Sequence, residues 1–366
     1  MAAKVRVGVI GTGFGSTVQI PAFRANPRVE VVAVASGQPG KARRIADSFG
    51  VPHAFDDYTK LAAADLDLVS VTTPTHLHHP MVMAAIAAGR HVLCEKPMAL
   101  STAEATEMRD AAQRAGVVHA IDHELRFNPN RRKVKRLIAE GFIGQPRHVL
   151  LSFASPMRRD PALPWGWWYD ATRGGGLLGA VGSHQIDLLR YWLGDVDAVL
   201  GTAETFVRER PDPGTGGPQA VTADDFTTFA LRFASGAIGV VLLSVVTAHA
   251  FGYRIEVWGD GGTLTLDDRE RLWGAPAGKE LADLTEPESL APATGMNYAP
   301  LWGLSFIRLV DHLAAAILDR APVAPAATFD DGLATQRVMD RLRARRPEAW
   351  SLVGAPPAPP PAPRGR

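Results

Sequence analysis

The stretch Lys4–Ser16, KVRVGVIGTGFGS, decides the fold of this chain. Its first half is a short run of β-branched residues that ends at Gly11, a pattern typical of a buried parallel strand. Gly11 and Gly13 permit a tight turn, and a helix-length segment follows to about Asn26. A glycine-rich turn between a strand and a helix offers free backbone N–H groups to a pyrophosphate. The stretch therefore predicts a dinucleotide-binding βα unit.

The same strand–helix alternation continues to about residue 122. Short apolar runs end near residues 35, 71, 94 and 121, and helical patterns lie between them at 41–49, 80–89 and 101–115. Ser101 and Glu104 form the Ser-x-x-Glu signature of a capping box at the start of the last of these helices. Alternation with short connections predicts a doubly wound parallel sheet with right-handed crossovers.

The pattern changes after residue 122. Helices are expected near 130–140, 180–193, 302–319 and 330–345, and strands joined by short turns are expected at 146–155, 196–207, 224–234, 237–247, 251–259 and 262–267. Short turns between successive strands predict an antiparallel sheet, and the Pro/Gly-rich residues 208–222 are expected to be a surface loop. We therefore predict an α/β protein with a Rossmann domain over 1–122, an α+β domain with an open, mostly antiparallel sheet over 123–350, and a disordered Pro-rich tail over 354–366.

Composition narrows the class of protein. Lys and Arg number 39 and Asp and Glu number 38, a formal net charge of +1 that excludes bulk electrostatic attraction to nucleic acid or membranes. Cys94 is the single cysteine, so an intramolecular disulfide is excluded. No signal-peptide pattern precedes the first strand, and the longest charge-free apolar stretch alternates like a hairpin, so we expect a cytoplasmic protein.

The end of the second strand bears on the choice of cofactor. An Asp or Glu usually binds the ribose 2′-hydroxyl there, but this chain has Ser36 and Gly37, and the nearest following acid is Asp47. Lys41 and two arginines lie close in the sequence instead. These groups favour the 2′-phosphate of NADP over NAD, although basic residues also commonly do no more than solvate a helix face.

Three further motifs carry a family resemblance. They are TTPTHLH at 72–78, GRHVLCEKP at 89–97, and GGGL at 174–177 followed by GSHQID at 182–187. Together with the nucleotide turn, they resemble the glucose–fructose oxidoreductase, inositol dehydrogenase and rhizopine-catabolism (Gfo/Idh/MocA) family. The resemblance implies NAD(P)-dependent oxidation of sugar or polyol hydroxyls, or reduction of the ketones. It also implies a homodimer or homotetramer that forms through the C-terminal sheet.

The resemblance assigns roles to particular residues. Lys96 is implied as the catalytic lysine, and it follows a parallel strand at the edge where such sheets bind ligands. His184 is the candidate acid/base, and Asp187, on the same helical face, is expected to orient the ring or bind a sugar hydroxyl. The expected cofactor contacts are Gly11, Thr12, Gly13, Phe14, Gly15, Ser36, Gly37, Lys41, Thr73, Pro74, His78, Glu95 and Lys96.

Substrate contacts are expected from His184, Asp187, Arg126 and Trp168. Arg126 binds substrate oxygens or pairs with a carboxylate across the domain junction, and both readings stay open. Trp168 belongs to an aromatic cluster whose rings can stack on sugar C–H faces, or pack in the core or at a subunit contact. His123 and Glu124 are supporting candidates. No metal site is predicted, because the histidines at 76, 78 and 79 lack a Cys pair or Glu at metal spacing.

One position departs from the family pattern. Many members carry an aspartate four residues before the histidine, where this chain has Ala180. Ala180 cannot relay a proton, so Lys96 and His184 must suffice, another group must substitute, or the reaction differs. Three functions are therefore compared: an NADP-dependent oxidoreductase, a redox-neutral glycosidase, lyase or epimerase that retains its nicotinamide, and a non-catalytic dinucleotide-binding sensor. The presence of Lys96 and His184 argues against the last.

Overall fold

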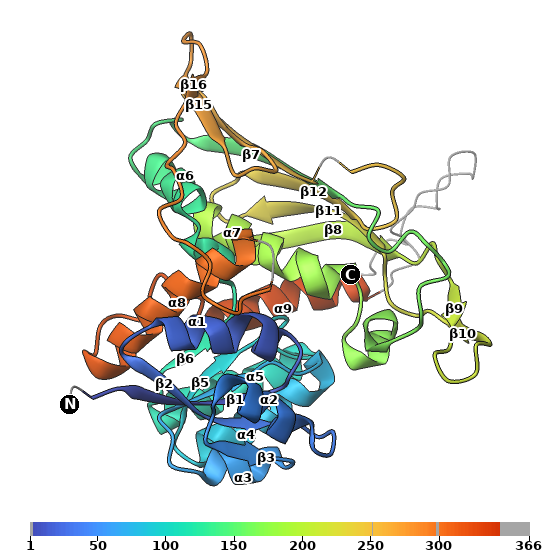
Figure 1. The fold of residues 1–366 in the computed structure, drawn as a ribbon. Helices are drawn as coiled ribbons and strands as arrows, with labels where there is room; N and C mark the ends of the chain where they lie inside the picture. Colours follow the sequence, from blue (N-terminus) through green and yellow to red (C-terminus); the bar gives the residue numbers. More distant parts are fainter. Residues whose placement is uncertain (1–2, 251, 298–299, 345–366) are drawn as a thin grey trace, which may run out of the picture.

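The N-terminal domain of the computed structural model is built on a six-stranded parallel sheet (Figure 1). The structure describes residues 3–250, 252–297 and 300–344. The sheet order is β3-β2-β1-β4-β5-β6, with β1 (Val5–Ile10), β2 (Val29–Ala35), β3 (His53–Phe55), β4 (Leu68–Val71), β5 (His91–Cys94) and β6 (His119–Ile121). The order reverses between β1 and β4, and ligands bind beyond the strand ends at such a switch point.

Helices connect these strands. They are η1 (Gly15–Gln19), α1 (Ile20–Ala25), α2 (Lys41–Phe49), α3 (Tyr58–Ala63), η2 (Thr75–Leu77), α4 (His78–Ala87) and α5 (Thr102–Ala115). The predicted capping box of α5 is half formed, because the Ser101 hydroxyl accepts from the Glu104 amide at 3.2 Å while the Glu104 carboxylate accepts from the amide of Leu100. The Rossmann prediction is confirmed by the sheet order and the parallel pairing.

The second sheet has eight strands in the order β16-β15-β14-β13-β7-β12-β11-β8. Its strands are β7 (Pro146–Ala154), β8 (Val196–Glu204), β11 (Phe226–Phe233), β12 (Ile238–Ser244), β13 (Gly252–Gly259), β14 (Gly262–Leu266), β15 (Leu272–Pro276) and β16 (Ala282–Asp283). All neighbouring strands pair antiparallel except β7 and β12, which run parallel. The expected open, mostly antiparallel sheet is confirmed.

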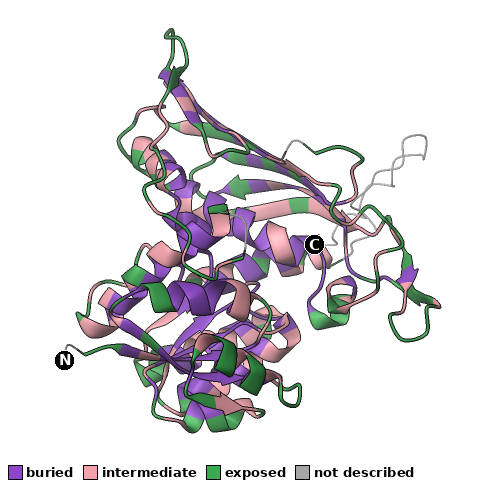
Figure 2. Cartoon of the chain, viewed as in Figure 1, coloured by how far each residue is buried: buried purple, intermediate pink, exposed green. Residues whose placement is uncertain are grey.

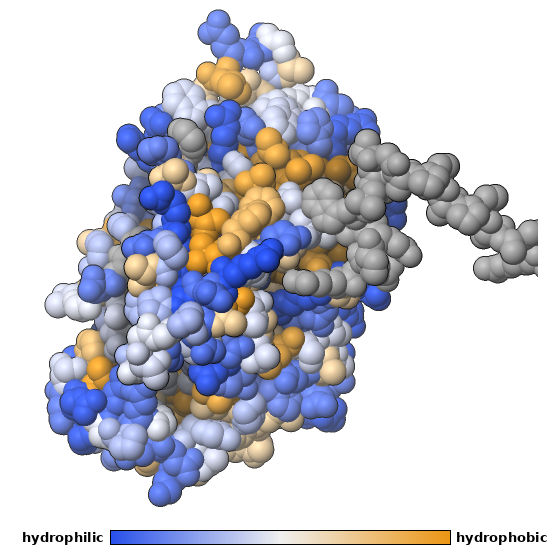
Figure 3. Space-filling model, turned by 90° about the vertical axis from the view of Figure 1, so that its right-hand side faces the viewer, coloured by the Kyte–Doolittle hydropathy of each residue, from blue (hydrophilic) through white to orange (hydrophobic). Residues whose placement is uncertain are grey.

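The two faces of this sheet differ. One face packs on α6 (Pro129–Ala139), α7 (Ser183–Leu193) and α9 (Phe329–Arg343), with buried apolar side chains such as Val241 and Ile255 meeting those of the helices. The strands alternate buried and exposed positions along their length (Figure 2). The outer face carries exposed apolar side chains: Leu150, Leu200, Ile238, Val240 and Leu242. Figure 3 shows apolar atoms gathered in the upper half of the molecule, where this domain lies.

The segment 208–222 differs from its prediction as a plain loop. It contains a small antiparallel hairpin of β9 (Glu209–Pro211) and β10 (Pro218–Ala220). Its one deeply buried arginine, Arg210, donates to the carbonyl oxygens of Arg158 and Asp160, and its guanidinium lies over the Tyr169 ring. The sequence predicted neither the β9–β10 pairing nor the contacts of Arg210. Pro and Gly residues indicate turns, and the segment lacks the alternation of apolar residues that indicates a strand.

After the second sheet the chain returns to the N-terminal domain. The helix α8 (Pro300–Leu318) packs Phe306, Leu309 and Leu313 into the core that contains β1 and β2. Farther on, the Ile121 amide donates to the Ala327 carbonyl at 2.8 Å. Within the described part of the chain α8 alone is long and apolar enough to cross a membrane, but half of it is buried against this core. The predicted tail at 354–366 lies outside the described residues.

Candidate active site

The glycine turn after β1 fits tightly against the end of β4. Gly11 has φ +112°, and a Cβ there would lie 2.6 Å from the Thr72 carbonyl oxygen. A Cβ on Gly15 would lie 2.7 Å from the Thr72 hydroxyl, whereas a Cβ on Gly13 would meet nothing within 4 Å. Gly11 and Gly15 therefore allow the turn to pack closely against Thr72. The space beside Gly13 is open.

The residues present fit the pyrophosphate of a dinucleotide. The amides of Thr12, Gly13 and Gly15 donate to no other described residue, and they lie where η1 begins at the β1/β4 switch point. The Thr72 hydroxyl is enclosed without a hydrogen-bond partner in the described residues. Free amides at a helix N-terminus bind phosphate oxygens. Phe14 lies within this turn and contacts the ring of Phe306 in α8 edge-on.

The end of β2 carries no carboxylate. Ser36 follows the strand, and its hydroxyl accepts from the Gln38 amide at 3.3 Å. Gly37 has open space where a Cβ would stand. Lys41 opens α2, and neither it nor Arg44 forms an ion pair with any described residue, whereas Arg43 pairs with Asp47 at 2.7 Å. Two cations beside the strand end are therefore not neutralised by a carboxylate.

His78 joins two of the turns at the sheet edge. It is 1% exposed, and its ring nitrogens lie 2.8 Å from the Thr73 carbonyl and 3.0 Å from the Pro97 carbonyl. Burial lowers the pKa of His78 to about 4, although both carbonyls oppose the shift. A neutral ring donates to one of the two carbonyls at a time. His78 therefore links the Thr73–Pro74 turn to the turn after β5.

Lys96 lies immediately after β5 and precedes a cis peptide bond to Pro97. Its Nζ donates to the carbonyl oxygen of Ala180 at 3.0 Å. The side chain of the neighbouring Glu95 is buried, and its Oε1 accepts a hydrogen bond from the side-chain amide of Gln19 at 3.0 Å. An ammonium carries three N–H donors, so the bond to Ala180 leaves two for other acceptors.

The carbonyl that holds Lys96 is positioned by a half-buried carboxylate, that of Asp224. Ala180 lies in η6 (Leu178–Gly182), a helical segment that runs directly into α7. Asp224 accepts from the Leu178 amide through its side chain at 2.7 Å and from the Leu177 amide through its carbonyl at 2.9 Å. Gly176, at φ +104°, has no room for a Cβ beside that carboxylate. The GGGL motif thus places the start of η6.

His184 lies one turn beyond Ala180 and is 2% exposed. Its Nδ1 is 3.5 Å from the Nδ1 of His123 and 3.8 Å from the Oε2 of Glu124. The indole of Trp302, at the start of α8, lies with its centroid 4.9 Å from that of the imidazole. Burial, and then the positive charge of Lys96, hold the pKa of His184 well below its ordinary value.

Three buried carboxyl groups lie around Lys96. Glu95, Asp122 and Glu124 are each less than a tenth exposed. Burial is the largest cause that raises the pKa of all three, and it raises that of Glu124 to about 8 while Lys96 opposes the shift. Of the three, Glu124 therefore keeps its proton at neutral pH. Within the described ranges no group of three or more His, Cys, Asp or Glu residues could hold a metal ion.

Asp187 does not bond to His184, so it does not orient the imidazole ring as expected. Its carboxylate receives two hydrogen bonds from Arg126, at 2.7 and 2.6 Å, and both side chains are buried. Arg126 also pairs with Asp331 of α9 at 3.0 Å. Of the two readings of Arg126, the structure shows pairing across the domain junction. The shared helical face of His184 and Asp187 was visible in the sequence, but the stronger partner of Asp187 was not.

Trp168 is partly buried and packs against the core of the second domain. Its ring lies under the guanidinium of Arg158, with 4.6 Å between the guanidinium carbon and the ring centroid, and its carbonyl accepts from the Gly176 amide at 2.9 Å. Sequence reasoning missed Trp302, because nothing local to it signals contact with His184. Only the packing of α8 across the domain junction brings the two rings together.

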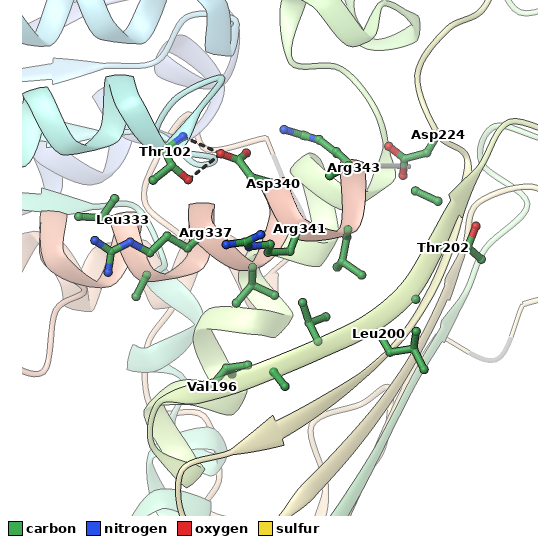
Figure 4. A pocket seen from close by; sticks show the side chains of 18 of the residues that line it. Thr102, Val196, Leu200, Thr202, Asp224, Leu333, Arg337, Asp340, Arg341 and Arg343 are labelled. Carbon is green, nitrogen blue, oxygen red and sulfur yellow. Dashed lines mark hydrogen bonds between the residues drawn. The ribbon is translucent and has the colours of Figure 1, made fainter. Parts of the chain in front are cut away.

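A cavity of about 1890 Å³ lies apart from these groups. It opens between α9 and β8 and is lined by residues that include Val196, Asp224, Arg337 and Arg341 (Figure 4). Thr102 of α5 is tied to Asp340 of α9 in its wall, with two bonds of 2.6 Å. Neither Lys96 nor His184 lines it. We therefore assign the candidate active site to the strand-end residues and not to this cavity.

Comparison with known proteins agrees with the two-domain fold described above. Residues 5–123 match the model of an oxidoreductase family with an NAD-binding Rossmann fold, and residues 131–265 match the C-terminal domain model of the same GFO/IDH/MocA family. Levoglucosan dehydrogenase of Pseudarthrobacter phenanthrenivorans is 30% identical, covering 73% of this chain and 75% of the relative. Glucose-fructose oxidoreductase domain-containing protein 2 of Homo sapiens is 30% identical, covering 95% of this chain and 93% of the relative.

A solved structure supports the same assignment. Levoglucosan dehydrogenase in complex with NADH and levoglucosan superposes with a TM-score of 0.83 at 27% identity, covering 93% of this chain and 96% of that chain. Both domains are therefore shared with it.

Proposed function

Because the chain belongs to the GFO/IDH/MocA family of oxidoreductases, we propose that it transfers a hydride between NADP and a carbinol or ketone carbon of a sugar or polyol. The observation that carries the proposal is the meeting of Lys96 and His184 at one edge of the parallel sheet. The Lys96 ammonium bonds to Ala180, one helical turn before His184. Similarity to a dehydrogenase solved with levoglucosan supports the substrate class.

The two side chains suit different parts of the reaction. A bound nicotinamide would accept or supply the hydride. Lys96 has N–H donors left for the reacting oxygen, and a fixed donor stabilises the negative charge that develops on that oxygen. His184 is neutral because its pKa is lowered, so it can accept the hydroxyl proton. Its Nε2 bonds to no described residue, so this nitrogen is the one available to substrate.

The preference for NADP rests on the end of β2. Lys41 and Arg44 are cations without carboxylate partners in the described residues, and Ser36 provides a hydroxyl where an acid would repel a 2′-phosphate. Guanidinium and ammonium groups bind phosphate through charge-assisted hydrogen bonds. NADH is the cofactor bound in the levoglucosan dehydrogenase complex. The cofactor preference of the present chain therefore has to be measured on this protein itself.

The experiment is an absorbance assay at the nicotinamide band with purified protein. NAD and NADP are each combined with a panel of aldoses, anhydrosugars and inositols, in both reaction directions. We expect turnover with at least one of these compounds and a higher kcat/KM with NADP. Tight binding of NADPH without turnover across the panel would contradict the proposal and favour a sensor.

A second candidate follows from Ala180, which lacks the carboxylate common in the family. A redox-neutral enzyme oxidises a sugar transiently and returns the hydride to the product after elimination, epimerisation or glycoside cleavage. Such an enzyme retains its nicotinamide. Nicotinamide that copurifies through gel filtration, with product formed but no net change in absorbance, would favour this function over the first.

We also propose a homodimer or homotetramer that assembles through the outer face of the C-terminal sheet. Val240 lies beside Leu150 across the β7–β12 pair, and both are about two-fifths exposed. Leu200 on β8 is 67% exposed. A contiguous row of exposed aliphatic side chains on a sheet marks a protein–protein surface.

A further inference from the structure

The imidazole of His184 has an acidic neighbour on its Nδ1 side. Glu124 follows β6 in the short helical segment η3 (Glu124–Phe127), and its Oε2 lies 3.8 Å from the Nδ1 of His184. Both side chains are at most 3% exposed. This separation is about 1 Å beyond hydrogen-bond length, and catalytic hydrogen bonds are often long before substrate binds.

The Glu124 carboxyl also has the Asp122 carboxyl as a hydrogen-bonding neighbour, but no N–H group of a described residue donates to its Oε2. Oε2 is enclosed and has no hydrogen-bond partner among the residues described. A buried carboxyl oxygen that lacks a partner is costly, so its retention points to a group that moves or shares a proton. Among the residues that the structure describes, His184 alone places an imidazole nitrogen within 4 Å of it.

Other charged groups face the pair from every element around it. They are Lys96 and Glu95 after β5, Asp122 and His123 after β6, and Arg131 in α6. Lys96 and Arg131 disfavour an imidazolium at His184 and so lower its pKa. Burial and the charge of Glu95 raise the pKa of Glu124 to about 8. Near neutral pH the pair is therefore a neutral imidazole beside a carboxyl group that ionises on the alkaline side.

We propose that Glu124 supplies the carboxylate that Ala180 lacks, and that it acts through Nδ1 to set the tautomer of His184. This role rests on the proposed hydride transfer. Ionised Glu124 accepts the Nδ1–H, which leaves a lone pair on Nε2. In alcohol oxidation the substrate O–H breaks, its proton bonds to Nε2, and the Nδ1 proton passes to Glu124. A bound, oxidised nicotinamide would supply the acceptor for the carbinol hydrogen and its electron pair.

In the reverse direction the same residues work in the opposite protonation state. Protonated Glu124 donates to Nδ1, so the imidazole proton is on Nε2 and is given to the ketone oxygen as the hydride arrives. Glu124 is thus a positioning residue, because it acts on substrate only through His184. His123 is the competing partner for Nδ1, at 3.5 Å, and the test distinguishes the two.

The test compares Glu124→Gln and Glu124→Asp with a matched surface control. Glu107 pairs with the Nε2 of His79 at 2.9 Å, but its side chain is 65% exposed, so Glu107→Gln removes the same kind of pair away from the cleft. We measure kcat and KM for alcohol oxidation from pH 6 to 10. We also record the ¹⁵N signals of the His184 ring in histidine-labelled protein without substrate, assigned with His184→Asn.

In the unmodified protein we expect oxidation to rise with an apparent pKa near 8 and the ring proton to move from Nε2 to Nδ1 over the same range. Glu124→Gln should lose the pH dependence of the tautomer and about 100-fold in kcat at pH 9, with KM changed by less than about threefold. Glu124→Asp should recover part of both. Glu107→Gln should match the unmodified protein.

An unchanged tautomer and pH profile in Glu124→Gln would overturn the proposal in favour of His123. If the glutamine variant fails to fold, the aspartate variant decides, because its shorter side chain should shift the profile. If the unmodified protein turns over no sugar, the proposed function fails, yet the nitrogen signals still show whether Glu124 controls the tautomer.

Discussion

Lys96 and Ala180 are joined across the two domains by a hydrogen bond of 3.0 Å from the lysine Nζ to the alanine carbonyl oxygen. The residue at 180 contributes its backbone carbonyl, because the alanine side chain has no hydrogen-bond acceptor. This hydrogen bond holds the Lys96 ammonium next to η6, the helical segment that continues into α7 and His184. The geometry of the candidate site thus depends on where η6 begins.

Lys96→Ala should abolish hydride transfer and leave cofactor binding largely intact. Loss of one fixed donor to the reacting oxygen costs about 100- to 1000-fold in kcat. Cofactor affinity, measured by nicotinamide fluorescence, should change by less than about threefold, since the glycine turn is untouched. Lys60→Ala on the exposed face of α3 is the control. An equal loss of affinity and rate would show that Lys96 serves cofactor binding instead.

Lys41→Asp should erode binding of NADPH more than binding of NADH. The substitution places a negative charge beside the proposed 2′-phosphate, and a tenfold change in the affinity ratio corresponds to about 1.4 kcal/mol. Lys279→Asp makes the same charge change at an exposed position after β15, in the other domain. Fluorescence titration of both cofactors measures the ratio. A larger effect on NADH would contradict the assignment of the phosphate site.

Arg126→Met should destabilise the fold strongly. The change leaves the buried carboxylate of Asp187 without its guanidinium, and breaking a buried ion pair costs about 3–5 kcal/mol. Arg147→Met is the control, because its pair with Asp260 is on the surface and is worth at most about 1 kcal/mol. Urea unfolding followed by circular dichroism gives both free energies. Similar losses in the two variants would refute the structural role of Arg126.

His78 should make the protein less stable in mild acid. Its folded pKa of about 4 lies below the ordinary 6.5, so the unfolded chain takes up a proton that the folded protein does not. The corresponding stability is present above pH 6.5 and is lost as the pH falls toward 4, to a total of about 3 kcal/mol. His78→Gln should flatten this part of the urea-unfolding profile, whereas His53→Gln, at an exposed position, should not.

Val240→Lys should shift the protein toward monomers. The lysine would place a charge in the row of exposed aliphatic side chains that includes Leu150. Light scattering after gel filtration should then report a mass near the 39.2 kDa of one chain. Ser48→Lys on the exposed side of α2 adds the same charge elsewhere and should leave the assembly unchanged. A dimer that persists in Val240→Lys would move the interface to another face.

The sequence predicted the elements whose signals are local. The β-branched run before Gly11 and the strand–helix alternation after it placed the Rossmann sheet, because buried parallel strands and capped helices each leave a short pattern. The three-residue strand β3 and the hairpin of β9 and β10 left no such pattern. The parallel pairing of β7 with β12 joins distant segments, so no local signal records it.

Contacts between side chains were less accessible than the elements themselves. The sequence placed Lys96 at a strand end, but it could not show that the partner of Asp187 is Arg126 and that His184 faces Glu124. Helical spacing tells which residues share a face, whereas the strongest available charge decides the partner. Trp302 reaches His184 only because α8 crosses the junction.

The return of α8 to the first domain also restricts how genes for such proteins can recombine. Phe306 and Leu313 fill the same core as β1 and β2, and Phe329 packs with the end of β6. A crossover that exchanged only the codons for the first 122 residues would combine the parallel sheet of one parent with the α8 and α9 of another. The apolar side chains of these helices would then face a core with which they did not evolve. The inheritable module therefore includes the last two helices, and chimaeras cut at a single point should be recovered less often than those cut at two.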